Sequence, residues 1–387
     1  MNKPIYLDYA AATPTDPRVV DAMVKCLTKD GAFANPHAKD HVYGWEACES
    51  METARAQVAE LIGVSPLEIT FTSGATESNN LAIFGLAQEL AALGDKRRHL
   101  ITTKIEHKAV LEACEHLERQ GYRVTYLTPH RDGTVDEALL KSALDEDTFL
   151  VSIAQANSVL GSVNDIKALS ALTRSYGAYF HTDTAQSAGY IETDFAHSDV
   201  SMATLTSEKV CGPKGVGALY VKRSLNLQLM AQIYGGGQEK GLRGGTVPTH
   251  QVVGMGMAFE ILKKEGASDK ERMEGYRQYL ISKLKTIPEA IINGSEAHHV
   301  PGILSVSFNH LDGRKLLPTL TGIAASTGSA CASADLKPSY ILTAVGLSDE
   351  QARASLRLSF GRFTTKSEIE AAAAEICLKV PKLIQED

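Results

Sequence analysis

The sequence predicts an α/β protein built around a mostly parallel sheet with helices on both faces. Two observations support this. Short apolar strand patterns alternate with amphipathic helical patterns through the middle of the chain, and this alternation is typical of parallel sheets that are buried on both faces. In addition, 387 residues are enough for a large core and for more than one domain.

The alternating region predicts the following elements in order. EITFTSGATESNNLAIFGLAQEL is typical of a strand, a glycine turn and a helix, and HLITTKIEHKAVLEACEHLERQG repeats the same plan. A further helix is expected near residues 165–177. Further strands are expected in YRVTYLTP, TFLVSIAQ, AYFHTDTAQ, SMATLTSEK and GVGALYVKR.

The pattern changes after about residue 250. The remaining elements predict a smaller α+β domain: helices at about 250–266 and 269–287, a strand at 303–309, a helix near 313–321, a strand near 322–326 and a helix from about 366. Residues 15–60 are largely helical in pattern. We therefore expect a large domain over residues 15–250 and a small domain made of residues 1–14 and 251–387.

Composition excludes several classes of function. The formal net charge is −7 and no long basic block occurs, so nucleic-acid binding is not expected as the main task. No apolar run approaches the roughly 20 residues that span a bilayer, and MNKPIYLDYAAATP lacks the apolar core of a signal peptide. A cytoplasmic protein without membrane contact is expected. The six cysteines show no CxxC pair and no zinc spacing, so no metal site is expected.

Three motifs follow predicted strands, where α/β sheets bind their ligands. In TSGATES (72–78), Thr76 lies near a helix N-terminus that could bind a phosphate; the alternative is a capped glycine turn. In HTDTAQS, Asp183 is a charge at a strand end; the alternative is a helix cap or a surface salt bridge. In TLTSEKVCGPKGV, Lys209 is a candidate for a Schiff base, and the alternative is a solvated lysine.

Together these three groups match what pyridoxal phosphate (PLP) requires. The phosphate needs a cradle of N–H groups, the pyridine nitrogen needs a carboxylate, and the aldehyde needs a lysine. We therefore expect PLP as the cofactor.

Two further residues have reactive or binding potential. Cys331 lies among Ser, Gly and Ala in STGSACASA (326–334), which predicts a mobile, exposed cysteine loop at about 324–336. An exposed thiol without a partner suggests a reactive group, and a harmless loop cysteine is the alternative. Arg357 in SLRLSFGR could bind a substrate carboxylate through two hydrogen bonds, and the alternative is a salt bridge.

Nearly the whole chain resembles the PLP-dependent cysteine desulfurases of the NifS/IscS type, in the class V aminotransferase family. The resemblance runs from YLDYAAATPTDPRV at residue 6 to LRLSFGRFTTKSEI at 356–369. Between them come, in order, IEHKAVLEAC, GPKGVGALYV, GGGQEKGLRGGTVPTHQ and GSACASADLKPSYIL. It implies fold type I of PLP enzymes, with a mostly parallel seven-stranded sheet in the large domain, and a homodimer.

The implied activity is removal of sulfur from L-cysteine, which yields L-alanine and a persulfide on Cys331. The sulfur then passes to an acceptor protein, an iron–sulfur scaffold or another sulfur carrier. By resemblance, Lys209 is the Schiff-base lysine, Asp183 the partner of the pyridine nitrogen, and Gln186 a donor to the ring oxygen. His107 is implied to stack on the ring and to move protons.

The resemblance implies three further sets of residues. Cofactor contacts are implied for Ala75, Thr76 and Thr206, and for Thr246 across the dimer interface. Substrate binding is implied for Asn35, Asn157 and Arg357, and Cys331 is the implied nucleophile.

The chain departs from the family pattern at three places. Glu208 stands where the family usually has His, and a carboxylate beside a phosphate is repulsive, by about 1 kcal/mol at 4 Å in water. Glu208 is therefore expected to turn away, to be protonated or to pair with a cation. QANSV (155–159) keeps Asn157 but not its neighbours. The sequence ends at QED, without the longer tail of scaffold-docking members, which leaves delivery to that scaffold open.

Other functions of the same fold stay open at this point. A selenocysteine lyase or a small-amino-acid aminotransferase would use the same cofactor chemistry. A catalytically impaired paralogue that acts by binding a partner is the non-enzymatic alternative, and Glu208 is the feature that favours it.

Overall fold

A seven-stranded sheet forms the centre of the fold. The computed structural model describes residues 3–192, 194–327 and 338–386. The strand order is β2-β8-β7-β6-β5-β3-β4, and the run from β7 to β4 is parallel, while β8 is antiparallel to both of its neighbours. The strands are β2 Ile69–Thr72, β3 His99–Thr103, β4 Arg123–Leu127, β5 Thr148–Ser152, β6 Tyr179–Asp183, β7 Met202–Thr206 and β8 Gly217–Val221.

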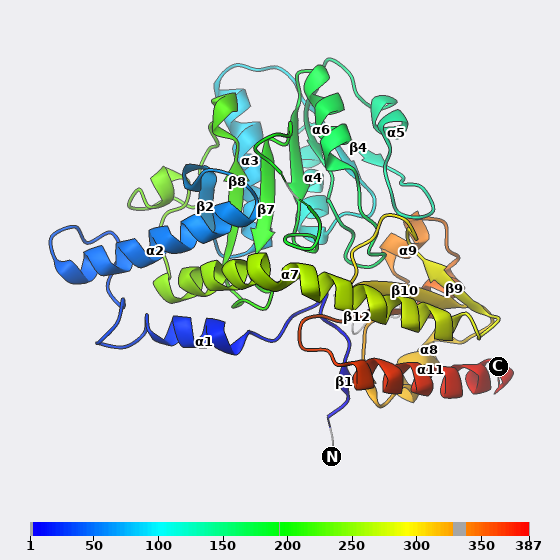
Figure 1. The fold of residues 1–387 in the computed structure, drawn as a ribbon. Coiled ribbons are helices and arrows are strands. Elements are labelled where there is room, and N and C mark those ends of the chain that lie inside the picture. Colours follow the sequence, from blue (N-terminus) through cyan, green and yellow to red (C-terminus); the bar gives the residue numbers. More distant parts are fainter. Residues whose placement is uncertain (1–2, 193, 328–337, 387) are drawn as a thin grey trace.

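This sheet confirms the predicted mostly parallel α/β architecture. All residues of β3, β5 and β7 are buried, as expected for parallel strands that are covered on both faces. Helices alternate with the strands along the chain and lie beside the sheet in Figure 1. They are α3 Ala75–Ala92, α4 Lys108–Arg119, α5 Glu137–Lys141 and α6 Ile166–Ser175.

One long helix links the sheet region to the rest of the molecule. Figure 1 shows α7, Thr249–Leu284, running past the sheet, and α7 packs against α1 (Pro17–Val24), α2 (Val42–Leu61) and α11 (Lys366–Glu386). The prediction of two helices in this region was wrong. Gly266 lies inside this continuous helix. Its lack of a side chain lets α7 come close to the backbone of Gly189, because a Cβ atom at this position would crowd Leu262 and the Gly189 carbonyl oxygen.

A second hydrophobic core lies around the C-terminal half of α7. It contains Met273, Leu280 and Leu284 of α7, together with Leu7 from near the N-terminus. An antiparallel sheet of order β12-β10-β9 and a parallel pair, β1 with β11, belong to this region. Its strands are β1 Ile5–Tyr6, β9 Ala290–Asn293, β10 Ile303–Phe308, β11 Ile323–Ala324 and β12 Ser355–Ser359, and its shorter helices are α8 Gly313–Thr319, α9 Tyr340–Ala344 and α10 Asp349–Arg353.

The first residues of the chain therefore pack with the C-terminal region. The domain boundaries at residues 14 and 250 stay a prediction. Within the described ranges, no helix is both long and apolar enough to cross a membrane.

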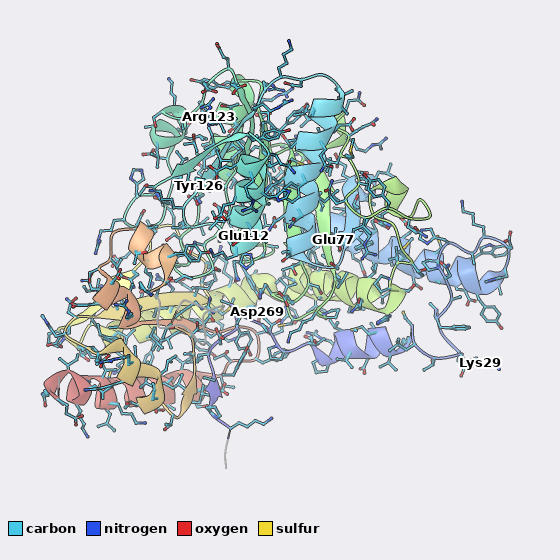
Figure 2. The ribbon with its side chains drawn as sticks, turned by 180° about the vertical axis from the view of Figure 1, so that it is seen from behind. Lys29, Glu77, Glu112, Arg123, Tyr126 and Asp269 are labelled. Carbon is cyan, nitrogen blue, oxygen red and sulfur yellow. The ribbon has the colours of Figure 1, made fainter. Side chains whose placement is uncertain are left out.

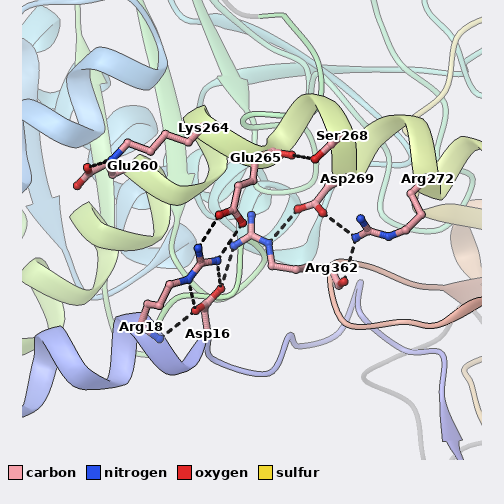
Figure 3. A network of polar contacts seen from close by, with 9 residues as sticks. All are labelled: Asp16, Arg18, Glu260, Lys264, Glu265, Ser268, Asp269, Arg272 and Arg362. Carbon is pink, nitrogen blue, oxygen red and sulfur yellow. Dashed lines mark hydrogen bonds and ion pairs between the residues drawn. The ribbon is translucent and has the colours of Figure 1, made fainter.

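A buried ion-pair network joins three distant segments (Figure 3). Arg362, after β12, contacts Asp16 at the start of α1 (Nη1–Oδ2, 3.2 Å) and Asp269 in α7 (Nε–Oδ2, 2.9 Å). Asp16 caps α1 and also pairs with Arg18 (2.8 Å), while Asp269 pairs with Arg272 (2.6 Å). The side chains of Asp16, Asp269 and Arg362 are at most 6% exposed. The network therefore fixes where residue 16 lies relative to α7 and the C-terminal region.

Removal of Arg362 should destabilise the fold. In Arg362→Met, two buried carboxylates lose a cation, and we expect the free energy of unfolding to fall by about 3 kcal/mol. Lys366→Met is the matched control, because it breaks only the exposed pair with Glu370 and should change stability by less than about 0.5 kcal/mol. Urea unfolding followed by circular dichroism measures both, and equal midpoints would contradict a stabilising role for the network.

The network should also weaken in acid. The hydrogen bonds from Arg18 hold the pKa of Asp16 at about 2, below its ordinary 3.8. Because the folded-state pKa is the lower one, this stabilisation is complete above about pH 4 and is lost as the pH falls toward 2. Asp16→Asn should flatten the loss of stability in that range, whereas Asp21→Asn, at an exposed site on the same helix, should leave its slope unchanged.

Candidate active site

A cavity of about 470 Å³ opens at the carboxyl ends of the parallel strands. Strand ends of an α/β sheet are where ligands bind. The cavity gathers predicted site residues that the sequence separates by up to 282 positions, from Ala75 to Arg357. The predicted site residues that line it are Ala75, Thr76, His107, Asn157, Asp183, Gln186, Thr206, Lys209 and Arg357.

The N-terminus of α3 forms one wall of the cavity. Gly74 precedes the helix at φ +148° and offers no side-chain cap, so the dipole and the N–H groups of the first turn face the cavity at Ala75 and Thr76. Thr206, at the end of β7, lines the same wall and is buried. A helix of 18 residues that starts at such a glycine is a suitable site for a phosphate.

Glu77, in the first turn of α3, links this wall to a distant segment. Its Oε2 accepts from the Ser73 N–H (2.8 Å) and its Oε1 contacts Arg243 Nε (3.0 Å). Figure 2 shows Glu77 at the end of α3 nearer to α7. The segment that carries Arg243 is held in turn by a buried pair between Arg55 and Glu239 (2.7 Å). The negative charge of Glu77 is therefore balanced by Arg243 next to the N–H groups at the N-terminus of α3.

Asp183 ends β6 and is almost fully buried. Its Oδ1 accepts from the Ala185 N–H (2.9 Å) and its Oδ2 from Asn79 Nδ2 (2.8 Å). Two donors fix the orientation of the carboxylate. This is the arrangement that a partner of a pyridine N–H requires.

Lys209 follows β7 and lines the cavity. Its Nζ contacts Glu208 Oε1 (3.1 Å) and donates to the carbonyl of Ala11. Of the three expectations for Glu208, the structure shows the pairing with a cation, and that cation is Lys209. Gln186 lies nearby and donates from Nε2 to the carbonyl of Ala10 (3.0 Å).

His107 is the N-cap of α4, and its Nδ1 accepts from the Ala109 N–H (3.1 Å). In the neutral ring, the proton then lies on Nε2. Glu106 lies behind it and is fully buried, with hydrogen bonds from Thr103 Oγ1 (2.8 Å) and the Ala154 N–H (3.1 Å). Burial raises the pKa of Glu106 to about 8. Glu106 thus joins the ends of β3 and β5, and the sequence analysis did not single it out, although it lies in IEHKAVLEAC.

Arg357 lies in β12 and is buried. Its Nη2 contacts Asp8 Oδ1 (2.7 Å), and its Nη1 donates to the carbonyl of Ser158 (3.0 Å). Nε has no hydrogen-bond partner among the described residues. The guanidinium is therefore fixed at the cavity, and its Nε–H has no partner among the described residues. Asp8 is a site residue that the sequence analysis missed.

Asn157 has most of its amide committed to the local turn. Its Oδ1 accepts from the N–H groups of Val159 and Leu160 (both 2.9 Å), and its Nδ2 donates to the carbonyl of Ile105 (2.9 Å). The side chain therefore shapes the wall of the cavity. Its role in substrate binding stays a prediction.

Three predicted residues are not brought to the cavity by the described chain. Asn35 and Thr246 are exposed and are not among its lining residues. Cys331 lies outside the described residues. The described residues on both sides of 328–337 do contact the site: Ser326 pairs with the backbone of Arg357 (2.6 Å), and the Tyr340 hydroxyl donates to the carbonyl of Glu106 (2.7 Å).

Among the described residues, no cluster of His, Cys, Asp or Glu could hold a metal ion.

Comparison with known proteins places this site in a family. Residues 5–372 match the family described as aminotransferase class-V. The chain is 51% identical over 383 residues to cysteine desulfurase IscS of Pseudomonas entomophila (strain L48), and 49% identical to that of Azotobacter vinelandii (strain DJ / ATCC BAA-1303). Each alignment covers 99% of this chain and 94% of the relative.

Solved structures agree with these relatives. A NifS-like protein superposes with a TM-score of 0.90 at 33% identity, covering 98% of this chain and 100% of that one. SspA in complex with cysteine superposes with a TM-score of 0.81 at 38% identity, covering 93% and 99%. The resemblance seen in the motifs is thereby confirmed, and the chain belongs to the aminotransferase class-V family, among its PLP-dependent cysteine desulfurases of the IscS type.

Proposed function

We propose that this protein removes sulfur from L-cysteine, releases L-alanine and holds the sulfur as a persulfide on Cys331. The observation that carries the proposal is the single cavity that brings together the α3 N-terminus, Asp183 and Lys209. The names of the IscS relatives and the cysteine bound to SspA support cysteine as the substrate.

The donor set fits PLP. The α3 N-terminus with Thr76 and Thr206 would hold the phosphate, Asp183 would accept from the pyridine nitrogen, and Gln186 would donate to the ring oxygen. The volume of about 470 Å³ lies within the usual range of ligand sites, about 300–1,000 Å³. When bound, PLP supplies an electron sink for the charge that develops at the substrate Cα.

The residues of the chain would then act in turn. Arg357 binds the substrate carboxylate, and the amine of Lys209 takes the proton from Cα. His107 lines the cavity, and its Nε2, the nitrogen not used by the Ala109 N–H, would exchange a proton with a thiol. The Cys331 thiolate attacks the substrate sulfur: an S–S bond forms, the C–S bond breaks, and the carbon fragment leaves as alanine after protonation.

The described ends of the Cys331 segment support this assignment. Ser326 is paired with Arg357 and Tyr340 is bonded to Glu106, so the chain leaves and returns at the cavity. An acceptor protein, an iron–sulfur scaffold or another carrier, would then take the sulfur. A cytoplasmic location stays a prediction from the sequence.

An exposed apolar surface supports a homodimer. Seven large apolar side chains of α1, α2 and the segment between them are 44–58% exposed: Val20, Val24, Leu27, Phe33, Val42, Tyr43 and Trp45. Several large exposed apolar side chains within one stretch of chain are typical of a protein interface. Asn35 lies within the same stretch of chain. A partner copy would therefore cover this surface, and Thr246 would reach the partner's phosphate site.

Cysteine turnover tests the proposed activity. The protein with PLP, L-cysteine and a reductant should yield sulfide and alanine in equal amounts. Cys331→Ala should lower sulfide release by more than about a hundredfold, keep the visible absorption of the lysine-bound cofactor, and show no persulfide in a mass spectrum. Cys48→Ala is the matched control and should behave as wild type. If Cys331→Ala still consumes its amino-acid substrate at the wild-type rate, the aminotransferase or selenocysteine lyase alternative is favoured.

Lys209→Ala tests the binding alternative. The wild type should show the visible absorption and Lys209→Ala should not. If the wild type stays colourless after incubation with PLP, the protein is not a PLP enzyme, and the catalytically impaired paralogue is favoured.

A charge on the apolar surface tests the homodimer. Trp45→Glu combined with Val24→Glu should convert a dimer to a monomer, because two carboxylates would be buried without partners. Leu378→Glu is the matched control, at a residue on α11 that is 60% exposed. Analytical ultracentrifugation measures the mass, and a wild-type monomer would contradict the proposal.

A further inference from the structure

A short turn, residues 104–107, joins β3 to α4 and brings His107 to the lining of the cavity. The backbone pairing between β3 and β5 ends before this turn, at Thr102 and Ser152. The position of His107 relative to the end of β5 therefore depends on the contacts that the turn itself makes.

The carboxyl group of Glu106 continues the link between the two strands beyond their last backbone pair. After β5, the N–H groups of Ile153 and Gln155 donate to the backbone of β6. The N–H of Ala154, which lies between them in sequence, donates instead to both carboxyl oxygens of Glu106 (3.1 Å each). Thr103, the last residue of β3, donates its hydroxyl to Oε1 of the same group (2.8 Å). One buried side chain therefore joins the two strand ends.

Two further contacts hold the backbone of the turn. Asn157 donates from Nδ2 to the carbonyl of Ile105 (2.9 Å), and the Tyr340 hydroxyl of α9 donates to the carbonyl of Glu106 (2.7 Å). Both reach backbone oxygens, which are present whatever side chain stands at position 106. The carboxyl group is thus the part of the support that a substitution of Glu106 removes selectively.

His107 is linked in turn to the start of α4. Its Nδ1 accepts from the Ala109 N–H (3.1 Å), and its carbonyl accepts from the N–H groups of Val110 (2.9 Å) and Leu111 (3.1 Å). The Ala109 amide therefore reports where the imidazole ring lies.

We propose that Glu106 is a positioning residue, which holds His107 at the cavity by fastening the turn between β3 and α4 to the end of β5. A shorter side chain would not reach Thr103 and Ala154 together, so the turn would shift and His107 would shift with it. The kinetic part of this proposal rests on the proposed function, in which His107 exchanges a proton.

The first test compares two substitutions of Glu106 in the full-length, cofactor-loaded protein. Glu106→Asp should lower kcat for L-cysteine roughly ten- to hundredfold, because a displacement of about 1 Å can cost about a hundredfold in rate. Glu106→Gln should stay close to wild type, because one oxygen, Oε1, already accepts from both Thr103 and Ala154. Burial raises the pKa of Glu106 to about 8, so the uncharged Gln side chain also matches the form that predominates near neutral pH.

A double-mutant cycle separates the positioning of His107 from a general loss of structure. Because Glu106 acts through His107, Glu106→Asp should lower kcat much less in a His107→Ala background than in the wild type. Equal factors in the two backgrounds would overturn the proposal. Glu112→Asp, the same change at an exposed position of α4, is the matched control and should leave kcat unchanged.

The second test needs no cofactor and reads the turn directly. Hydrogen exchange of the cofactor-free protein, followed by peptide fragmentation and mass spectrometry, measures the Ala109 amide. Glu106→Asp should speed its exchange by roughly three- to tenfold through local opening. His107→Ala should speed it as well, and Glu106→Gln should not. Amides inside α3 are the internal standard, because global unfolding would speed them too.

Thr103→Val provides a second variant in case Glu106→Asp does not fold. It removes the hydroxyl donor to Oε1 and leaves the carboxyl group in place, so it should move both measurements in the same direction by a smaller factor. Thr103→Ser keeps the hydroxyl and is the control.

The outcomes separate this inference from the proposed function. Wild-type exchange at Ala109 in both Glu106→Asp and Thr103→Val would show that Glu106 does not position His107. Absence of turnover in the wild type would contradict the proposed function instead, and the exchange rates would still decide the role of Glu106.

Discussion

The geometry of the cavity depends on one short stretch of backbone, residues 8–16. Asp8 contacts Arg357, the carbonyls of Ala10 and Ala11 accept from Gln186 and Lys209, and Thr13 donates to Glu208. Asp16 ends the stretch in the buried network with Arg362. The segment is flanked by Leu7 in one hydrophobic core and Val19 in the other. Because it contacts both Lys209 and Arg357, it determines how these two side chains are placed relative to each other.

Three carboxylates border a cavity that is suited to an anionic cofactor, which is an unusual balance of charge. Each is compensated locally: Glu77 by Arg243, Asp183 by Asn79 and a backbone N–H, and Glu208 by Lys209. An uncompensated pair of like charges 4 Å apart costs about 4 kcal/mol at an effective dielectric constant of 20. The pairing therefore allows a site with several acids to attract a phosphate to the α3 N-terminus.

The sequence predicts the parts of the site that depend on local pattern. A strand end locates Asp183, strand ends with glycine turns locate Thr76 and Lys209, and motif resemblance adds Gln186 and His107. Asn79, the partner of Asp183, and Asp8, the partner of Arg357, could not be predicted. No local pattern joins Asp8 to Arg357 across 349 positions. The single helix α7 was missed for a related reason: Gly266 has its purpose in packing against Gly189, which only the fold reveals.

If Arg357 binds the substrate as proposed, it connects the substrate to the chain that leads toward Cys331. Its side chain lies at the cavity, with Nη1 on the Ser158 carbonyl and Nη2 on Asp8, while its backbone pairs with Ser326. A substrate carboxylate that binds the guanidinium must share it with Asp8, whose side chain is 23% exposed. One residue of β12 therefore provides both the guanidinium at the cavity and the backbone contact to Ser326.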